Sequence, residues 1–200
     1  MSNLLQCIGY YIVEKSIKPE WMDIPCKEIL NVSSCICNIY PNVWEGKENE
    51  ISYLFENKRL DVDGRFTNLA DAKDIFNKYL YKVNNLKIVG ICTSKENIEQ
   101  LKNDENFGIN APVSNENIEG KNIGCDILGA DNGNFHSYLC NDLEKEIKKK
   151  YKVLFTENGL IANEYKEVEK MAKYIKELGE PVDWLPYILY EYTESINHSK

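Results

Sequence analysis

The segment GCDILGADNGNFHSYLCNDL, residues 124–143, carries the clearest strand–turn–helix signal in the chain. Its first part belongs to an apolar run, residues 122–130, that predicts a strand. The Asp-Asn-Gly-Asn sequence at 131–134 then predicts a turn. A helix is predicted after the turn by apolar residues at steps of four: Phe135, Leu139, Leu143 and Ile147. We therefore expect a strand with a helix packed against it.

Similar patterns extend on both sides of this segment. Helices are predicted where apolar residues recur at helical spacing after a capping residue, at 68–83, directly after Ser94, and at 163–179. Strands are predicted at 4–15, 51–60, 86–94 and 182–192. Asn158-Gly159 predicts a tight turn. Residues 27–41 fit either a short helix or a continuous strand, and Pro186 favours an edge or a bulge for the last strand.

These elements predict a single α/β or α+β domain spanning residues 1–200. We expect a mixed β-sheet of about five to seven strands with helices packed on it, and the alternation in the C-terminal third favours some parallel pairing. Residues 103–122 are rich in Gly, Pro, Asn and Ser and show little periodicity. This stretch is a candidate subdomain boundary and a candidate contact loop.

Composition restricts the function classes. The net charge is −8, and only Arg59 and Arg65 are arginines, which argues against nucleic-acid binding. The N-terminus has no basic leader, and no apolar run approaches the ~20 residues needed to cross a bilayer. Seven cysteines, an odd number, are expected to be reduced and buried. We therefore expect a cytoplasmic protein without membrane partners, whose acidic surface suits a basic partner.

The catalytic candidates are His136, Cys140 and Asp131. On a helix, His136 and Cys140 would be neighbours at positions i and i+4. A thiol beside an imidazole near a helix N-terminus suits a nucleophile or a pair of metal ligands, with Asp131 orienting the histidine. In the alternative that we favour, both residues border the apolar stripe of the helix and pack against the sheet.

Other motifs are weaker. Cys35-x-Cys37 lacks the second ligand pair of a structural zinc site, so we expect no metal. Asp61-x-Asp63-Gly64 resembles part of a calcium loop, but Arg59 and Ala70 occupy ligand positions. The common dinucleotide, nucleotide-phosphate, serine-hydrolase and zinc-protease motifs are absent from the sequence, and we expect no cofactor.

Aromatic residues gather near the C-terminus, interleaved with carboxylates. If exposed, this mixture suits a protein interface, because tyrosine supplies contact area at low entropic cost. If buried, it is a strand packed on the core. The binding candidates are Trp184, Tyr187, Tyr190, Glu191 and Tyr192.

The C-terminal third also carries a resemblance. DILGADNGNFHSYLCNDLEKE, NGLIANEYKEVEKMAKYIKEL and EPVDWLPYILYEY together resemble a pattern found in bacterial proteins to which no activity is attached. In size and acidity the chain is similar to the small cytoplasmic immunity proteins of bacterial toxin systems. That similarity implies a protein that masks a partner.

We therefore expect a non-enzymatic cytoplasmic binding protein, such as an immunity or regulatory protein, that masks a protein partner through an acidic, tyrosine-rich surface. One alternative is a small hydrolase or transferase using His136 with Cys140 or Asp131. Another is a structural or phage-derived protein without a small-molecule site.

Overall fold

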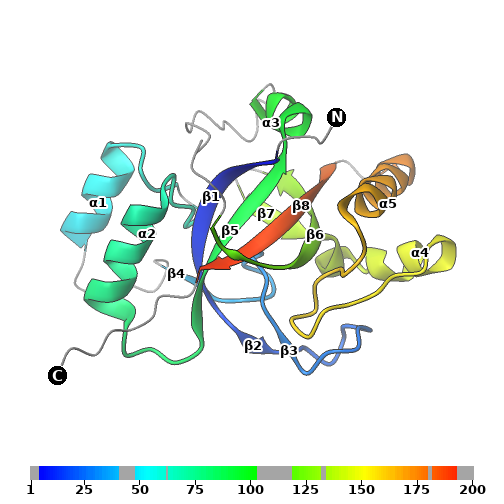
Figure 1. The fold of residues 1–200 in the computed structure, drawn as a ribbon, viewed down its shortest axis with the longest axis horizontal. Helices are drawn as coiled ribbons and strands as arrows, with labels where there is room; N and C mark the ends of the chain where they lie inside the picture. Colours follow the sequence, from blue (N-terminus) through cyan, green and yellow to red (C-terminus); the bar gives the residue numbers. More distant parts are fainter. Residues whose placement is uncertain are drawn as a thin grey trace.

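The computed structural model describes residues 5–40, 48–61, 63–102, 119–131, 134–179 and 182–192. Its centre is a six-stranded sheet in which every neighbouring pair is antiparallel (Figure 1). The strands are, in spatial order, β4 (Ile39–Tyr40), β1 (Leu5–Glu14), β5 (Leu86–Ser94), β8 (Asp183–Tyr192), β6 (Lys121–Asp131) and β7 (Asn134–Ser137). A second sheet pairs β2 (Ser16–Ile17) with β3 (Glu28–Ile29).

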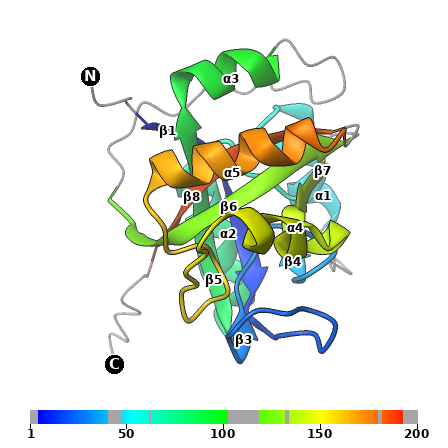
Figure 2. The same ribbon diagram turned by 90° about the vertical axis from the view of Figure 1, so that its right-hand side faces the viewer.

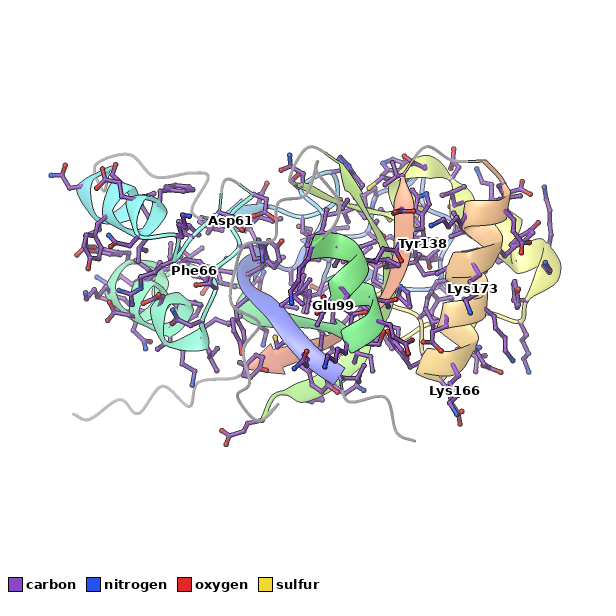
Figure 3. All side chains as sticks on the ribbon, turned by 90° about the horizontal axis from the view of Figure 1, so that it is seen from above. Asp61, Phe66, Glu99, Tyr138, Lys166 and Lys173 are labelled. Atoms are coloured by element: carbon purple, nitrogen blue, oxygen red, sulfur yellow. The ribbon has the colours of Figure 1, made fainter. Side chains whose placement is uncertain are left out.

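Helices cover both faces of the central sheet. One face carries α1 (Glu48–Glu56) and α2 (Leu69–Ile75), which continues as the π-helix η1 (Phe76–Leu80) (Figure 1). The opposite face carries α3 (Lys95–Lys102), α4 (Leu143–Lys150) and α5 (Tyr165–Glu177), with α5 lying across the sheet (Figure 2). Seen from above, Phe66 lies on the α1–α2 side and Tyr138 on the α4–α5 side (Figure 3).

The side chains of β1 show why this strand lacks polar side chains over residues 7–13. Tyr11 and Val13 belong to the larger core, beneath α3, α4 and α5. Tyr10 and Ile12 belong to the smaller core, beneath α1 and α2. A strand that is buried on both faces has no solvent-facing positions, so it does not alternate between apolar and polar residues.

The α+β form of the expected fold is confirmed, as are most of its elements. β1 and β5 occupy the predicted positions, and the Asn68 side chain caps α2 by accepting a bond from the Asp71 backbone N–H at 2.9 Å. Ser94 caps α3 in the same way, accepting from Asn97 N at 3.3 Å. The helix α5 ends before Gly179, which has a φ of 85°.

Two local predictions were wrong. Residues 51–60 were expected to be a strand, but they contribute most of α1, which packs Leu54 into the smaller core. The range 27–41 is described as far as residue 40, and residues 27–40 form neither a helix nor a continuous strand. They contain β3, a turn at 34–36 and β4.

The helix predicted from Phe135 onward begins only at Leu143. Residues Asn134–Ser137 instead form β7, which pairs with the end of β6 from Asp131↔Asn134 to Leu128↔Ser137. A short 3₁₀ helix, η2 (Tyr138–Asn141), follows, and Asp142 adopts a left-handed conformation with a φ of 56°. The Asn132-Gly133 dipeptide is a strong hairpin signal, and strand pairing outweighed the four-residue apolar spacing.

This hairpin also explains why the expected parallel pairing is wrong. A parallel neighbour needs a strand–helix–strand crossover, whereas β7 turns the chain back directly after β6. The strand β8 then enters between β5 and β6, antiparallel to both. It is therefore a central strand, and the edge position, one of the two possibilities that Pro186 suggested beside a bulge, is wrong. The described pairing of β8 with β5 covers residues 188–192 and does not include Pro186.

We expect Leu189→Ala to lower the free energy of unfolding by about 2–5 kcal/mol, because it removes methyl groups from a fully buried position in the central strand. The matched control is Leu178→Ala, at a position that is 42% exposed after α5, which should cost less than about 1 kcal/mol. Urea unfolding followed by circular dichroism measures both values. Equal losses in the two variants would contradict the central role of β8.

Candidate functional site

The structure separates His136 from Cys140 in a way that the sequence did not predict. His136 lies on β7 and Cys140 in η2, so the two are not neighbours on one helix. Both side chains are half-buried. Among the described residues, no hydrogen bond joins them. Asp131 ends β6, and its side chain lies outside the described part of the structure.

The neighbours of these two residues come from the segment 31–37, about a hundred residues earlier. Cys35 Sγ lies 3.5 Å from His136 Nδ1, and these residues are 101 positions apart. Ser33 Oγ lies 3.4 Å from Cys140 Sγ. The thiol in contact with the imidazole is therefore Cys35, which is exposed at the turn. We call Cys35, His136 and Cys140 the thiol–imidazole cluster.

A buried carboxylate lies beneath this cluster. Asp126 on β6 accepts hydrogen bonds from Asn31 Nδ2 at 2.6 Å, from Ser137 Oγ at 3.0 Å and from the Ile127 backbone N–H at 2.8 Å. The Asn31 side chain also accepts from the Ser33 backbone N–H at 2.8 Å, which links the carboxylate to the cluster. Burial raises the pKa of Asp126 to about 7 despite these three donors.

The cluster does not have the chemistry expected of a Cys140 nucleophile. Burial raises the pKa of the Cys140 thiol to about 11, so at neutral pH it is protonated. Nor does any group of three or more His, Cys, Asp or Glu residues in the described ranges have the geometry to hold a metal ion. The predicted pairing of His136 with Cys140 is therefore not supported as a catalytic dyad.

The aromatic residues of β8 do not form an exposed surface. Trp184, Tyr187 and Tyr192 are buried, and Tyr190 is half-buried. Glu191 pairs with Lys87 on β5 at 2.6 Å. A central strand has both faces covered, so these residues contribute to the cores and not to the interface that we considered.

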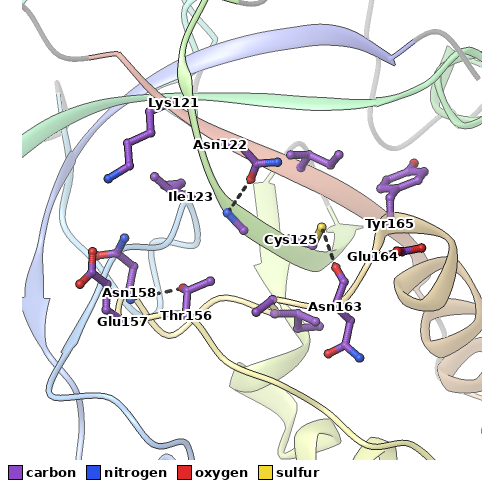
Figure 4. Close-up of a pocket in the computed structure, with 14 residues that line it drawn as sticks. Lys121, Asn122, Ile123, Cys125, Thr156, Glu157, Asn158, Asn163, Glu164 and Tyr165 are labelled. Carbon is purple, nitrogen blue, oxygen red and sulfur yellow. Dashed lines mark hydrogen bonds between the residues drawn. The ribbon is translucent and has the colours of Figure 1, made fainter.

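A pocket of about 450 Å³ lies at the beginning of β6 (Figure 4). Two of its residues, Lys121 and Asn122, belong to the candidate contact loop 103–122, of which 103–118 lie outside the described residues. The pocket is lined by Lys121–Cys125, Thr156–Asn158, Ile161–Tyr165 and Ile188.

Gly124 shapes this pocket. The register of β6 with β8 shifts between Asn122 and Gly124, and Gly124 has a φ of 130°, which favours glycine. A Cβ atom there would lie 2.8 Å from the Leu160 Cβ, so glycine also permits the close approach of the 156–161 turn. That turn is the one predicted from Asn158-Gly159, and it is confirmed by the Phe155↔Ile161 bridge.

The two sides of β6 differ over its first residues. One side pairs with β8 from Lys121 onward. The other side pairs with Ile161 at Cys125 and with β7 from Leu128. Within the described ranges, no strand pairs with this second side between Lys121 and Gly124. The pocket lies beside this open stretch.

Comparisons of the sequence with protein-family models and with curated proteins, and of the fold with solved structures, found no match. The resemblance of the C-terminal third to bacterial proteins therefore stays a prediction. Among the described helices, none has the length and apolar character required to span a membrane.

The buried carboxylate leads to a prediction about pH. The pKa of Asp126 is about 7 in the folded chain and about 4 in the unfolded chain, so the folded state holds its proton more tightly. The contribution of Asp126 to stability should be complete below pH about 4 and should fall by up to about 4 kcal/mol as pH rises through 7.

Asp126→Asn should remove this part of the pH dependence, because the amide does not titrate. Urea unfolding of wild type and variant at several pH values between about 4 and 8 measures the difference in slope. In the control, Asp74→Asn at a position on α2 that is 59% exposed, the loss of stability that Asp126 causes with rising pH should remain. Parallel stability curves for wild type and Asp126→Asn would contradict the prediction.

Proposed function

We propose that this protein is a non-enzymatic binding protein that takes up an extended, basic segment of a protein partner at the open side of β6. The observation that carries this proposal is the pocket beside Lys121–Gly124, where the strand has one side without a pairing strand in the described ranges. An extended segment can add to such a strand through its main chain, which provides affinity without a specific sequence.

Side chains of the pocket favour a basic occupant. The exposed residues Glu157 and Glu164 lie toward opposite ends of the pocket (Figure 4), and neither is in an ion pair within the described residues. Lys121 contributes one positive charge, so the lining carries one more carboxylate than cations. The net charge of −8 adds a long-range attraction for a basic partner.

Polar groups that point into the pocket would also contact the main chain of the occupant. The Asn158 side chain lines the pocket and makes no hydrogen bond within the described residues. In contrast, the Asn163 side chain is fully used: it accepts from the Leu154 backbone N–H at 2.8 Å and donates to Lys152 O at 3.0 Å. Asn158 therefore offers the pocket a complete amide for a ligand, whereas the Oδ1 of Asn122, the third amide in the lining, already accepts from the Gly124 backbone N–H at 2.9 Å.

A cytoplasmic location and a masking role complete the proposal. None of the seven cysteines, all of which lie in the described residues, forms a disulfide, which fits a reducing compartment. A strand-like contact that covers a basic segment would make that segment inaccessible to its own target, as expected of an immunity or regulatory protein. The form of the hydrolase or transferase alternative that uses Cys140 loses support, because this thiol is protonated at neutral pH and no hydrogen bond joins it to His136 among the described residues.

A nine-residue peptide of alternating lysine and valine is a suitable probe, because it is basic and forms extended structure. We expect it to shift the backbone amide NMR signals of Lys121–Gly124 and of the 156–158 turn. Glu157→Gln combined with Glu164→Gln should weaken binding about five- to tenfold, since it removes the carboxylates that face the lysines.

The control variant carries Glu56→Gln and Glu177→Gln, which change the net charge equally at exposed positions outside the pocket. It should bind the peptide as wild type does, apart from a small loss of long-range attraction. If both double variants weaken binding equally, or if the shifted signals lie elsewhere, the pocket is not the binding site.

A further inference from the structure

The thiol–imidazole cluster holds two cysteines from distant parts of the chain at one place on the surface. The 33–37 turn is closed by bonds from the Ile36 and Cys37 backbone N–H groups to Ser33 O, at 3.0 and 3.1 Å. This turn packs on β7 and η2 through two sulfur contacts, Cys35 with His136 and Ser33 with Cys140. The geometry therefore places Cys35 and Cys140 on facing segments.

The two thiols differ in the way that a reactive and a resolving cysteine differ. Cys35 is exposed, so an oxidant reaches it from solvent, and its sulfur lies 3.5 Å from a nitrogen that is able to accept its proton. Cys140 is half-buried next to Ser33, and burial raises the pKa of its thiol. It is therefore less accessible to an oxidant than Cys35, and it lies on the segment that faces the turn carrying Cys35.

We propose that Cys35 and Cys140 form a reversible oxidation site, in which a hydroperoxide oxidises Cys35, His136 accepts its thiol proton, and Cys140 then closes a disulfide. This site is independent of the pocket at β6 and of the function proposed for it. The other cysteines are unsuited, because Cys7, Cys37, Cys92 and Cys125 are buried and Cys26 has no histidine partner within the described residues.

The chemistry balances with hydrogen peroxide as the oxidant. The Cys35 thiolate attacks one peroxide oxygen, the O–O bond breaks, and the departing hydroxide takes the proton from His136 to form water. The Cys140 sulfur then attacks the Cys35 sulfenic acid, the S–O bond breaks, and the second hydroxide takes the Cys140 thiol proton. Two thiols and one hydrogen peroxide give one disulfide and two waters.

Treatment of the purified full-length chain with hydrogen peroxide tests the site, with peptide mass spectrometry under non-reducing conditions as the measurement. We expect a cross-linked pair of peptides that contain Cys35 and Cys140, lighter by two hydrogen atoms than the separate thiol peptides. Dithiothreitol should separate them again. Cys140→Ser should leave a sulfenic acid on Cys35 that dimedone labels, and Cys35→Ser should leave Cys140 as a thiol.

The role of His136 has its own test. His136→Asn should slow oxidation of Cys35 about tenfold, while circular dichroism shows that the fold is retained. Cys26→Ser is the matched control and should cross-link as wild type does. The proposal is overturned if wild-type Cys35 proceeds to sulfinic acid without a link to Cys140, or if His136→Asn leaves the oxidation rate unchanged.

Discussion

The central sheet depends on the insertion of β8 between β5 and β6. The N-terminal strands β4, β1 and β5 form one half of the sheet, and β6 with β7 forms the other. In the described sheet these halves share no direct pairing, so β8 joins them through its two antiparallel ladders. Because β8 is the last of the described strands along the chain, the described sheet is complete only when residues 183–192 are in place. The dominant contacts are long-range, which is typical of slow-folding topologies.

This position of β8 also explains what its aromatic residues do. Tyr187 and Leu189 are fully buried in the larger core, and Phe135 packs edge-on against Tyr187 with ring centroids 5.4 Å apart. The aromatic residues of β8, which in the sequence resembled a protein interface, therefore pack between the sheet and the two layers of helices. The proposed binding site lies at the periphery, where the first residues of β6 pair with β8 alone among the described strands and where Gly124 admits the 156–161 turn.

A second constraint is the polar contact between the 31–37 segment and the β6–β7 hairpin. Asp126 is buried and needs its three donors, and one of them, Asn31, lies 95 residues away in sequence. This demand fixes the segment against β7. As a consequence, Cys35 lies beside His136 and Ser33 lies beside Cys140. The need of the buried Asp126 for hydrogen-bond donors thus places the thiol of Cys35 beside the imidazole of His136 at the surface.

The amino-acid sequence by itself determined the elements whose signals are local. The capping residues Asn68 and Ser94 predicted the starts of α2 and α3. The Asn158-Gly159 pair predicted a turn, and two apolar runs predicted the strands β1 and β5. It did not determine strand order, the burial of the tyrosines or the thiol partner of His136. Those depend on contacts between residues about a hundred positions apart. Such contacts form where apolar faces are buried against each other and where buried polar groups find partners. Both the buried faces and the polar partners are set by the tertiary structure.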